Sequence, residues 1–393
     1  MSTGSHRERV AVERMAAGGD ALGHLADGRV VFVEGALPGE TVVADVHTLK
    51  RDFARARVAE VVEPSPHRMV PSCPELSRGC GGCGWQHIDP SAQLEWKAAV
   101  VAEALRRTGR EPDASVVVGG AVDPWGYRTT MRLAVAPDGR VGLRSAHSHR
   151  IVPLRECPVA HPALSALLPA VRVRSADEVV LRVSAATGAT TAYTPMVHGR
   201  IDGLPDRAAV GPDAVLHEVV DGVRLRVSAA SFFQSGPQAA SLLVATVRAA
   251  CGDLLGDAGL GPVLDAYGGV GLFAAGLGLR DAVVVESSPS SCADARLNLP
   301  HAIVEETAFE LWRPREVRLA IVDPARAGLG AEACDVLVAT RAERIVLVSC
   351  DPVSLARDTA LLRERGYAHR VTTVLDLFPH TSHVEAVTVF EPR

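Results

Sequence analysis

A cysteine follows an apolar stretch near the C-terminus of this 393-residue chain. Residues 345–349 are apolar or small, and Cys350 comes next, ahead of Asp351 and a proline. If the stretch is a buried strand of a parallel sheet, its carboxyl end opens onto the crevice where such sheets bind ligands. A thiol there is a candidate nucleophile, with a buried structural thiol as the alternative. The Asp351 carboxylate is expected to oppose formation of the thiolate, and Arg326 or a helix N-terminus could offset that effect.

Two acidic residues occupy positions where a binding group or a general base would be useful. Residues 319–322 form a second apolar stretch, which ends at Asp323 ahead of a proline. Glu385 closes the polar segment 376–385 and precedes the expected last strand. A carboxylate at such a place is a candidate general base. The alternative interpretation of this segment is a solvated loop followed by an acidic strand start.

A glycine-rich turn lies upstream of these residues. Residues 263–267 predict a strand, and three glycines follow within 268–271, where they allow a ligand to approach the backbone closely. Glu286 ends the next apolar stretch about 20 residues on, and an acid there can accept hydrogen bonds from ribose hydroxyls. The spacing fits a nicotinamide dinucleotide or S-adenosylmethionine. Ala274 replaces the last glycine of the G-x-G-x-x-G pattern, which favours the phosphate-free S-adenosylmethionine.

The eight cysteines are unevenly spaced, and three of them lie within eleven residues. An iron–sulfur cluster or zinc could be bound by these three together with a fourth, distant one: Cys73, Cys80, Cys83 and Cys157. Unliganded cysteines are the third interpretation. The other cysteines apart from Cys350 fall on expected helices and are most simply core residues.

The elements that must position these residues change in character along the chain. Apolar strands alternate with helical patterns from about residue 237 onward, which predicts a parallel α/β sheet. The expected strands are 262–267, 282–286, 319–323 and 344–349, and the expected helices are 272–279, 290–299, 331–340 and 354–365. At the other end, short strands at 29–33, 41–46 and 56–62 are separated by turn residues, which predicts a five-stranded barrel of a kind that often binds oligonucleotides.

We therefore predict an α/β protein of three domains. They are a β-barrel of OB-like shape at 1–63, a central α+β domain with the cysteine cluster at 64–230, and a Rossmann-like domain at 231–393. The central domain is expected to be strand-rich, with a helix at 91–109. The length of the chain suits two or three cores of this kind.

Composition sets bounds on location and partners. The net charge of −5 argues only mildly against nucleic-acid binding, because local patches matter more than totals. No uncharged apolar run reaches about 18 residues, and the N-terminus lacks the apolar stretch of a signal peptide. We expect a cytoplasmic protein with no membrane partner and no disulfides.

Five motifs, in order and spacing, resemble the RNA 5-methyluridine methyltransferase family, whose methyl donor is S-adenosylmethionine. They are Ser231-Phe232-Phe233-Gln234, the turn at 265–271, the loop at 323–328, the segment 349–352 and the ending at 378–385. The N-terminal domain is similar to the TRAM module in residues 35–40 and 50–57. The likeness covers nearly the whole chain.

The resemblance implies a mechanism and a set of site residues. The Cys350 thiolate would add to C6 of a uridine, so that C5 can attack the methyl group, and Glu385 would remove the C5 proton. Cofactor or uracil contacts are implied for five residues: Gln234, Tyr267, Glu286, Thr307 and Asp323. The four clustered cysteines would hold a [4Fe–4S] cluster, although their first gap is one residue longer than the family's pattern.

The resemblance also implies an RNA partner. A TRAM module with a cluster favours 23S ribosomal RNA over transfer RNA, which stays the alternative, and we expect a monomer. The basic and aromatic stretch at 50–57 would hold phosphates and stack a base. A non-catalytic RNA-binding or assembly protein and an iron–sulfur electron carrier are the other possibilities. Two departures concern the site: Ala325 replaces a usual proline, which would loosen its loop, and Asp351 replaces a usual asparagine.

Overall fold

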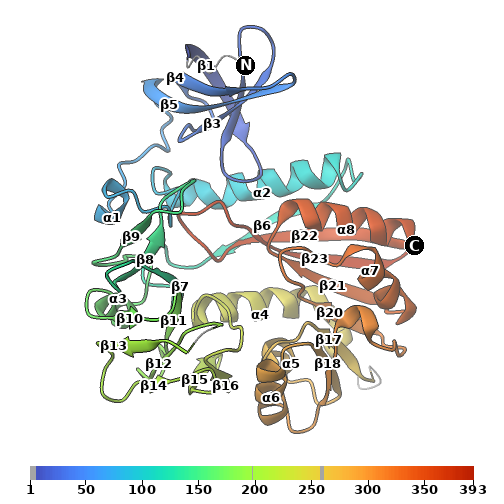
Figure 1. Ribbon diagram of the computed structural model, residues 1–393. Coiled ribbons are helices and arrows are strands. Elements are labelled where there is room, and N and C mark those ends of the chain that lie inside the picture. The colour runs from blue at the N-terminus through green and yellow to red at the C-terminus, as the bar shows by residue number, and fades with distance from the viewer. Residues whose placement is uncertain (1–5, 197, 257–260) are drawn as a thin grey trace.

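The computed structural model describes residues 6–196, 198–256 and 261–393, so the first five residues of the predicted barrel domain lie outside it (Figure 1). Five N-terminal strands close into a barrel in the order β1-β2-β3-β5-β4. Alternate residues along them are buried, such as Val31 and Val33, because successive side chains of a strand point to opposite faces. The predicted barrel is confirmed, and its strands are β1 His6–Met15, β2 Ala21–His24, β3 Val30–Glu34, β4 Thr41–Leu49 and β5 Phe53–Glu63.

The C-terminal part is built on an eight-stranded sheet in the order β19-β18-β17-β20-β21-β23-β22-β6. The first five strands in this order run parallel, whereas β23 is antiparallel to both β21 and β22. Since the parallel strands end at one edge, that edge is where the predicted site residues gather. The strands are β6 Val116–Ala121, β17 Val263–Ala266, β18 Ala282–Glu286, β19 Ile303–Glu306, β20 Leu319–Val322, β21 Arg344–Ser349, β22 Tyr367–Asp376 and β23 Glu385–Pro392.

Helices and short turns connect these strands, and the predicted Rossmann-like arrangement is confirmed. Proline occupies the first turn of α4, α6 and α8, where its missing N–H costs no helical hydrogen bond. The connecting elements are α4 Pro237–Cys251, η1 Gly252–Gly256, α5 Leu272–Leu277, α6 Pro289–Asn298, η2 Phe309–Leu311, α7 Gly330–Ala339 and α8 Pro352–Glu364.

The part between barrel and Rossmann-like sheet is rich in strands, as predicted. It contains a six-stranded sheet in the order β14-β12-β11-β7-β8-β9 and two pairs, β10-β13 and β15-β16. Its helices are α1 Pro74–Ser77, α2 Pro90–Arg107 and α3 Pro162–Leu167. Its strands are β7 Thr130–Val135, β8 Val141–Arg144, β9 Ile151–Pro153, β10 Arg172–Arg174, β11 Glu178–Val183, β12 Thr190–Tyr193, β13 Arg200–Asp202, β14 Ala209–Val210, β15 Val215–Val220 and β16 Val223–Ser228.

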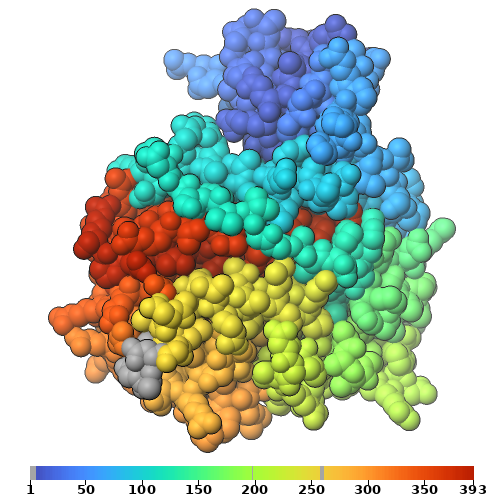
Figure 2. Space-filling view, turned by 180° about the vertical axis from the view of Figure 1, so that it is seen from behind, coloured from blue at the N-terminus to red at the C-terminus, as the bar shows by residue number. Residues whose placement is uncertain are grey.

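Two elements from the range 64–230 join the C-terminal sheet instead of the central one. β6 pairs in parallel with β22 at the outer edge of the eight-stranded sheet. α2 contacts β6, β22 and α8 on one side and β1 of the barrel on the other. Figure 1 shows α2 lying between the barrel and the sheet, and Figure 2 shows the barrel joined to this layer over a narrow base. The division at 63 and 230 stays a prediction, and segment 90–121 crosses it in space.

One described helical segment, Pro237–Gly256, has the length and composition of a membrane-crossing helix, with a mean hydropathy of 1.4. Arg248 and Asp253 interrupt it, which is why no such segment was expected from an uncharged run. Its buried side chains, Leu243, Val244 and Val247 among them, belong to the largest apolar core. A core helix passes the same test, so this finding is weak evidence for a membrane span.

A buried ion pair links α2 to the end of β22. Lys97 is fully buried, and its Nζ donates to Asp376 Oδ1 at 2.6 Å and to the backbone oxygen of Phe378 at 3.2 Å. Burial lowers the pKa of Lys97, although the charge of Asp376 acts to raise it. Burial likewise raises the pKa of Asp376, although the charge of Lys97 acts to lower it. Loss of hydration therefore outweighs attraction, so the pair fixes the position of α2 rather than adding net stability.

Replacing Lys97 by methionine leaves the Asp376 carboxyl buried without its partner. We expect Lys97→Met to lower the free energy of unfolding by about 3–5 kcal/mol. The double variant Lys97→Met/Asp376→Leu should recover most of that loss, because it buries neither charge. Urea unfolding followed by tryptophan fluorescence measures the stability of the wild type, of Lys97→Met, of Asp376→Leu and of the double variant. A double variant whose loss of stability equals the sum of the two single losses would contradict this account.

Candidate active site

Three residues predicted from the sequence meet at the carboxyl edge of the parallel strands. Asp323 follows β20, Cys350 follows β21, and Glu385 is the first residue of β23. Because β23 is antiparallel to β21 and Ala386 pairs with Ser349, the start of one strand lies beside the end of the other. The register therefore places the Glu385 carboxyl and the Cys350 thiol next to each other.

The thiol of Cys350 lies in a mixed electrostatic environment. Burial raises its pKa to about 11, the charges of Glu385 and Asp323 act in the same direction, and Arg326 opposes them. The carboxyls of Asp323 and Glu385 are themselves raised in pKa by burial, and Glu385 further by the charge of Asp323. A carboxyl with a raised pKa is a stronger proton acceptor, as a general base requires.

The Asp351 carboxylate, which is expected to oppose the thiolate, caps α8, and its effect on the thiol stays a prediction. Its side chain caps α8 by accepting hydrogen bonds from the backbone N–H groups of Val353 at 3.0 Å and Ser354 at 2.8 Å. A carboxylate at a helix N-terminus is stabilised by the helix dipole. The acids that raise the pKa of Cys350 are Glu385 and Asp323, which are distant in sequence.

The loop that carries Arg326, where Ala325 replaces the family's usual proline, is hydrogen-bonded to α8. Ser354 Oγ donates to the Arg326 backbone oxygen at 3.1 Å. Asp358 accepts from the backbone N–H groups of Leu329 at 2.7 Å and Gly330 at 3.1 Å. These hydrogen bonds fix the loop without a proline.

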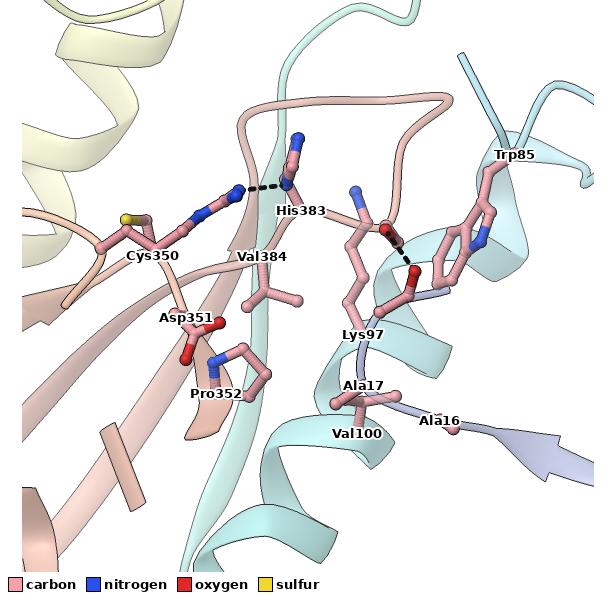
Figure 3. Close-up of a pocket in the computed structure, with 13 residues that line it drawn as sticks. Ala16, Ala17, Trp85, Lys97, Val100, Cys350, Asp351, Pro352, His383 and Val384 are labelled. Carbon is pink, nitrogen blue, oxygen red and sulfur yellow. Dashed lines mark hydrogen bonds between the residues drawn. The ribbon is translucent and has the colours of Figure 1, made fainter. Parts of the chain in front are cut away.

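Cys350 lines a cavity of about 210 Å³, shown in Figure 3. Arg326 donates to His383 Nδ1 at 2.7 Å across one side of it. Burial, assisted by the charge of Arg326, lowers the pKa of His383 to about 4, so the imidazole is neutral and can accept that bond. The cavity is lined by the C-terminal segments, α2, Trp85 ahead of α2, and the barrel: Ala16, Ala17, Gly18, Trp85, Lys97, Val100, Arg326, Cys350, Asp351, Pro352, Ser382, His383 and Val384.

The β1–β2 turn of the barrel forms one wall of this cavity. Trp85 Nε1 donates to the Gly19 backbone oxygen at 3.0 Å, and Ser382 Oγ donates to that of Gly18 at 3.3 Å. Gly19 has a φ of +103°, and a Cβ there would lie 2.7 Å from Ser382 Cβ, so only glycine fits. The sequence predicts a turn at this place but not its contact with Ser382, 364 positions from Gly18. The glycines of the turn are the one local signal.

A second, smaller cavity of about 30 Å³ lies at the glycine-rich turn. It brings together three predicted cofactor residues, Gln234, Tyr267 and Asp323. Tyr267 has a φ of +57°, and its hydroxyl donates to Glu310 Oε1 at 2.8 Å. Aromatic side chains beside an amide and a carboxyl match the chemistry of the adenosine and amino-acid ends of S-adenosylmethionine. The volume itself is about that of one water molecule, so the cofactor would have to widen the cavity or lie largely outside it. The full lining is Phe232, Phe233, Gln234, Tyr267, Gly268, Gly269, Val270, Leu272, Phe273 and Asp323.

The other two predicted cofactor residues lie beside this cavity and are not part of its described lining. The Glu286 carboxylate accepts from the backbone N–H groups of Gly269 at 3.0 Å, Ser287 at 2.8 Å and Ser288 at 2.7 Å. The Thr307 N–H donates to the Glu286 backbone oxygen at 2.9 Å. In this arrangement Glu286 holds the glycine-rich turn, and its ribose contact stays a prediction, as does the adenine contact of Thr307.

The four predicted cluster cysteines line one apolar cavity of about 30 Å³: Cys73, Cys80, Cys83 and Cys157. Burial raises the pKa of the Cys83 thiol to about 12 and also raises those of Cys80 and Cys157. Four thiols on one cavity are a donor set suited to an iron–sulfur cluster, whose positive iron would favour the thiolates. Within the described ranges, however, no three His, Cys, Asp or Glu side chains converge as metal ligands do.

Comparison with known proteins matches two family models. Residues 6–59 match the TRAM domain, and residues 313–392 match the tRNA (Uracil-5-)-methyltransferase family. A tRNA (uracil-54, C5)-methyltransferase of Pyrococcus abyssi, solved with S-adenosyl-L-homocysteine, is 25% identical, with a TM-score of 0.71, over 97% of this chain and 99% of that one. The likeness in fold to this neighbour therefore extends over nearly the full length of both chains.

Sequence relatives cover the chain equally well. An uncharacterized RNA methyltransferase of Streptomyces avermitilis is 36% identical over 98% of both proteins. The 23S rRNA (uracil(1939)-C(5))-methyltransferase RlmD of Halomonas elongata is 33% identical over 99% of this chain and 91% of its own length. With the thiol, the acids and the cofactor cavity at one sheet edge, the chain belongs to the family of S-adenosylmethionine-dependent RNA (uracil-C5)-methyltransferases.

Proposed function

We propose that this enzyme methylates C5 of a uridine in 23S ribosomal RNA through a covalent adduct with Cys350. The observation that carries the proposal is the meeting of Cys350, Glu385 and Asp323 at one edge, between two cavities. The larger cavity offers room for a base extruded from the RNA, and the smaller one has the lining of a cofactor site. Asp323 lines the smaller cavity and also acts on the thiol of the larger.

The chemistry follows from the poor reactivity of C5 in a free uracil ring. The Cys350 thiolate adds to C6, which makes C5 enolate-like and nucleophilic. C5 would then bond to the methyl group that S-adenosylmethionine supplies, while the methyl–sulfur bond breaks and its electron pair stays on the cofactor's sulfur. Glu385 accepts the proton that C5 still carries, the ring double bond reforms, and the C6–sulfur bond breaks to return the thiolate. In this scheme Gln234 and Asp323 position the cofactor and the uracil.

Charge around the thiol governs how readily the first step begins. The ionised Glu385 and Asp323 carboxylates oppose the Cys350 thiolate, and the Arg326 guanidinium favours it. Because the pKa of Glu385 is raised, this carboxyl gains a proton more readily than an ordinary glutamate and then no longer repels the sulfur. Arg326 is oriented by His383, so the neutral imidazole acts on the thiol indirectly.

Ribosomal RNA is favoured over transfer RNA by the relatives. Several relatives at 31–33% identity are 23S rRNA uracil-C5 methyltransferases, whereas the tRNA enzyme is 25% identical. Transfer RNA stays the alternative substrate. The intact pairing of Cys350 with Glu385 argues against a scaffold without activity. We also propose a cytoplasmic monomer whose barrel contacts RNA through residues 50–57.

A [4Fe–4S] cluster held by Cys73, Cys80, Cys83 and Cys157 is part of the proposal. Two observations support the cluster. All four thiols line one apolar cavity, and Gly82 lies on the same lining, where its backbone can approach a cluster sulfur. Methyl transfer needs no redox step, so such a cluster would hold the central part in shape or contact RNA.

Trapping on RNA that contains 5-fluorouridine tests the function. Fluorine at C5 cannot leave as a proton, so wild-type enzyme with S-adenosylmethionine should form a stable protein–RNA adduct, seen by denaturing electrophoresis. Cys350→Ala should form no adduct and no 5-methyluridine while still binding RNA. Glu385→Gln should accumulate adduct on ordinary RNA and turn over about 10²–10⁴-fold more slowly. Turnover by Cys350→Ala would refute the nucleophile.

Alkylation rates test the charge environment of the thiol without RNA. At a pH between 9 and 10, below the Cys350 pKa of about 11, Glu385→Gln should speed iodoacetamide labelling of Cys350, because it removes a charge that raises that pKa. Arg326→Gln should slow labelling for the opposite reason. The Cys350→Ser protein gives the background from the other cysteines. Equal rates in both variants would show that these charges do not act on the sulfur.

Metal analysis tests the cluster. Protein purified without oxygen should contain about four iron and four sulfide per chain, with the visible absorbance of a cluster. Replacement of Cys83 by serine should lower both contents, whereas Cys334→Ser, at a buried core cysteine of α7, should leave them unchanged. Zinc as the only bound metal would overturn this part of the proposal.

A further inference from the structure

The cavity at Cys350 continues into a second one beneath the barrel. The second has a volume of about 450 Å³ and shares Ala16, Ala17 and Val100 with the first. We name it the barrel–helix groove, since its walls are the barrel and α2, with one residue of α8. Its lining is Arg14, Met15, Ala16, Ala17, Leu22, Phe32, Val100, Glu103, Ala104, Arg107, Thr108 and Val353. A chain that leaves the Cys350 cavity on this side has to pass along the groove.

Arginines stand on both walls of the groove. Arg14 comes from β1 and Arg107 from the last turn of α2. The side chain of Arg14 is partly exposed, and that of Arg107 is largely exposed. Glu103 lies between them, 3.6 Å from Arg14 Nη2 and 3.9 Å from Arg107 Nη1, and it also accepts a hydrogen bond from Arg106 at 2.9 Å. Three guanidinium groups surround the single Glu103 carboxylate, so this end of the groove is positively charged. The chain as a whole has a net charge of −5.

An aromatic ring completes the groove on the barrel side. Phe32 of β3 lines it, with the Arg55 guanidinium 5.6 Å from the ring centroid and the Phe53 ring at 6.1 Å edge to face. A ring beside cations is a common platform for stacking a base of single-stranded RNA. Val353, about half exposed, adds apolar surface at the junction with the Cys350 cavity.

We propose that the barrel–helix groove binds the nucleotide next to the target uridine as single-stranded RNA. Its phosphates would lie against Arg14 and Arg107, and its base against Phe32. The volume falls within the range of about 300–1,000 Å³ usual for small-ligand sites, which is enough for one nucleotide. This proposal rests on the proposed function. It places the RNA beside the Cys350 cavity in the barrel–helix groove.

Equilibrium RNA binding by Arg14→Gln and Arg107→Gln tests this path. The probe is a uridine-containing single-stranded RNA of about 16 nucleotides, titrated by fluorescence anisotropy at several salt concentrations without S-adenosylmethionine. Each variant should bind more weakly, and the slope of log K against log salt should become shallower by about 0.7 for each lost phosphate contact. Binding of S-adenosylmethionine, which occupies another cavity, should not change.

Glu103→Gln separates an RNA contact from a structural role. Arg14 and Glu103 form one pair between barrel and α2, so either variant breaks it. If the pair only fastens the barrel, both variants weaken RNA binding alike. If the groove holds phosphates, Arg14→Gln weakens binding and Glu103→Gln strengthens it, because a competing anion is removed. Arg341→Gln, which breaks the exposed pair with Glu316 at the opposite edge of the sheet, is the matched control and should bind as wild type does.

The outcomes distinguish this proposal from the proposed function. The groove is not the RNA path if both arginine variants keep the wild-type RNA affinity and the wild-type slope of log K against log salt. It is also not the RNA path if Glu103→Gln binds RNA more weakly than the wild type does. Adduct formation by the wild type on 5-fluorouridine RNA is measured in the same preparations. This measurement tests Cys350 as the nucleophile independently of the groove. Opposite effects of Arg14→Gln and Glu103→Gln, with a shallower salt slope in the former, support the groove.

Discussion

The antiparallel pairing of β23 with β21 is the constraint on which the site depends. In a sheet of parallel strands only, a residue that begins a strand lies at the edge opposite to one that ends a strand. Because β23 reverses direction, Glu385 at its start lies beside Cys350 at the end of β21. The general base and the nucleophile therefore come from two backbone segments that are fixed to each other by hydrogen bonds.

Burial at this edge sets the electrostatics of the reaction. The same removal from water raises the pKa of the Cys350 thiol and of both neighbouring carboxyls. It makes the carboxyls better proton acceptors and the thiolate harder to form, and Arg326 supplies the compensating charge. Asp323 lines the cofactor cavity and acts on the thiol, so one carboxyl links the two halves of the site.

The residues that could be predicted from the sequence share a simple property. Cys350, Asp323 and Glu385 each border an apolar stretch, and the alternation of strands and helices predicts that such borders meet at one edge. The roles of Lys97 and Gly19 could not be predicted, since no local pattern states which distant segment lies opposite. The capping bonds of Asp351 to Val353 and Ser354 likewise appear only once α8 is placed.

The edge strand β6 has a consequence for how the protein is made. Val116 of β6 pairs with Thr372 of β22, 256 residues later. At a synthesis rate of about 5–20 residues per second, the ribosome needs roughly 10–50 s to produce that partner. Throughout this interval the segment Val116–Ala121, with its run of three valines, lacks the strand it pairs with. An unpaired apolar strand can pair with other chains, and early docking of β6 against α2 would protect the nascent chain from this.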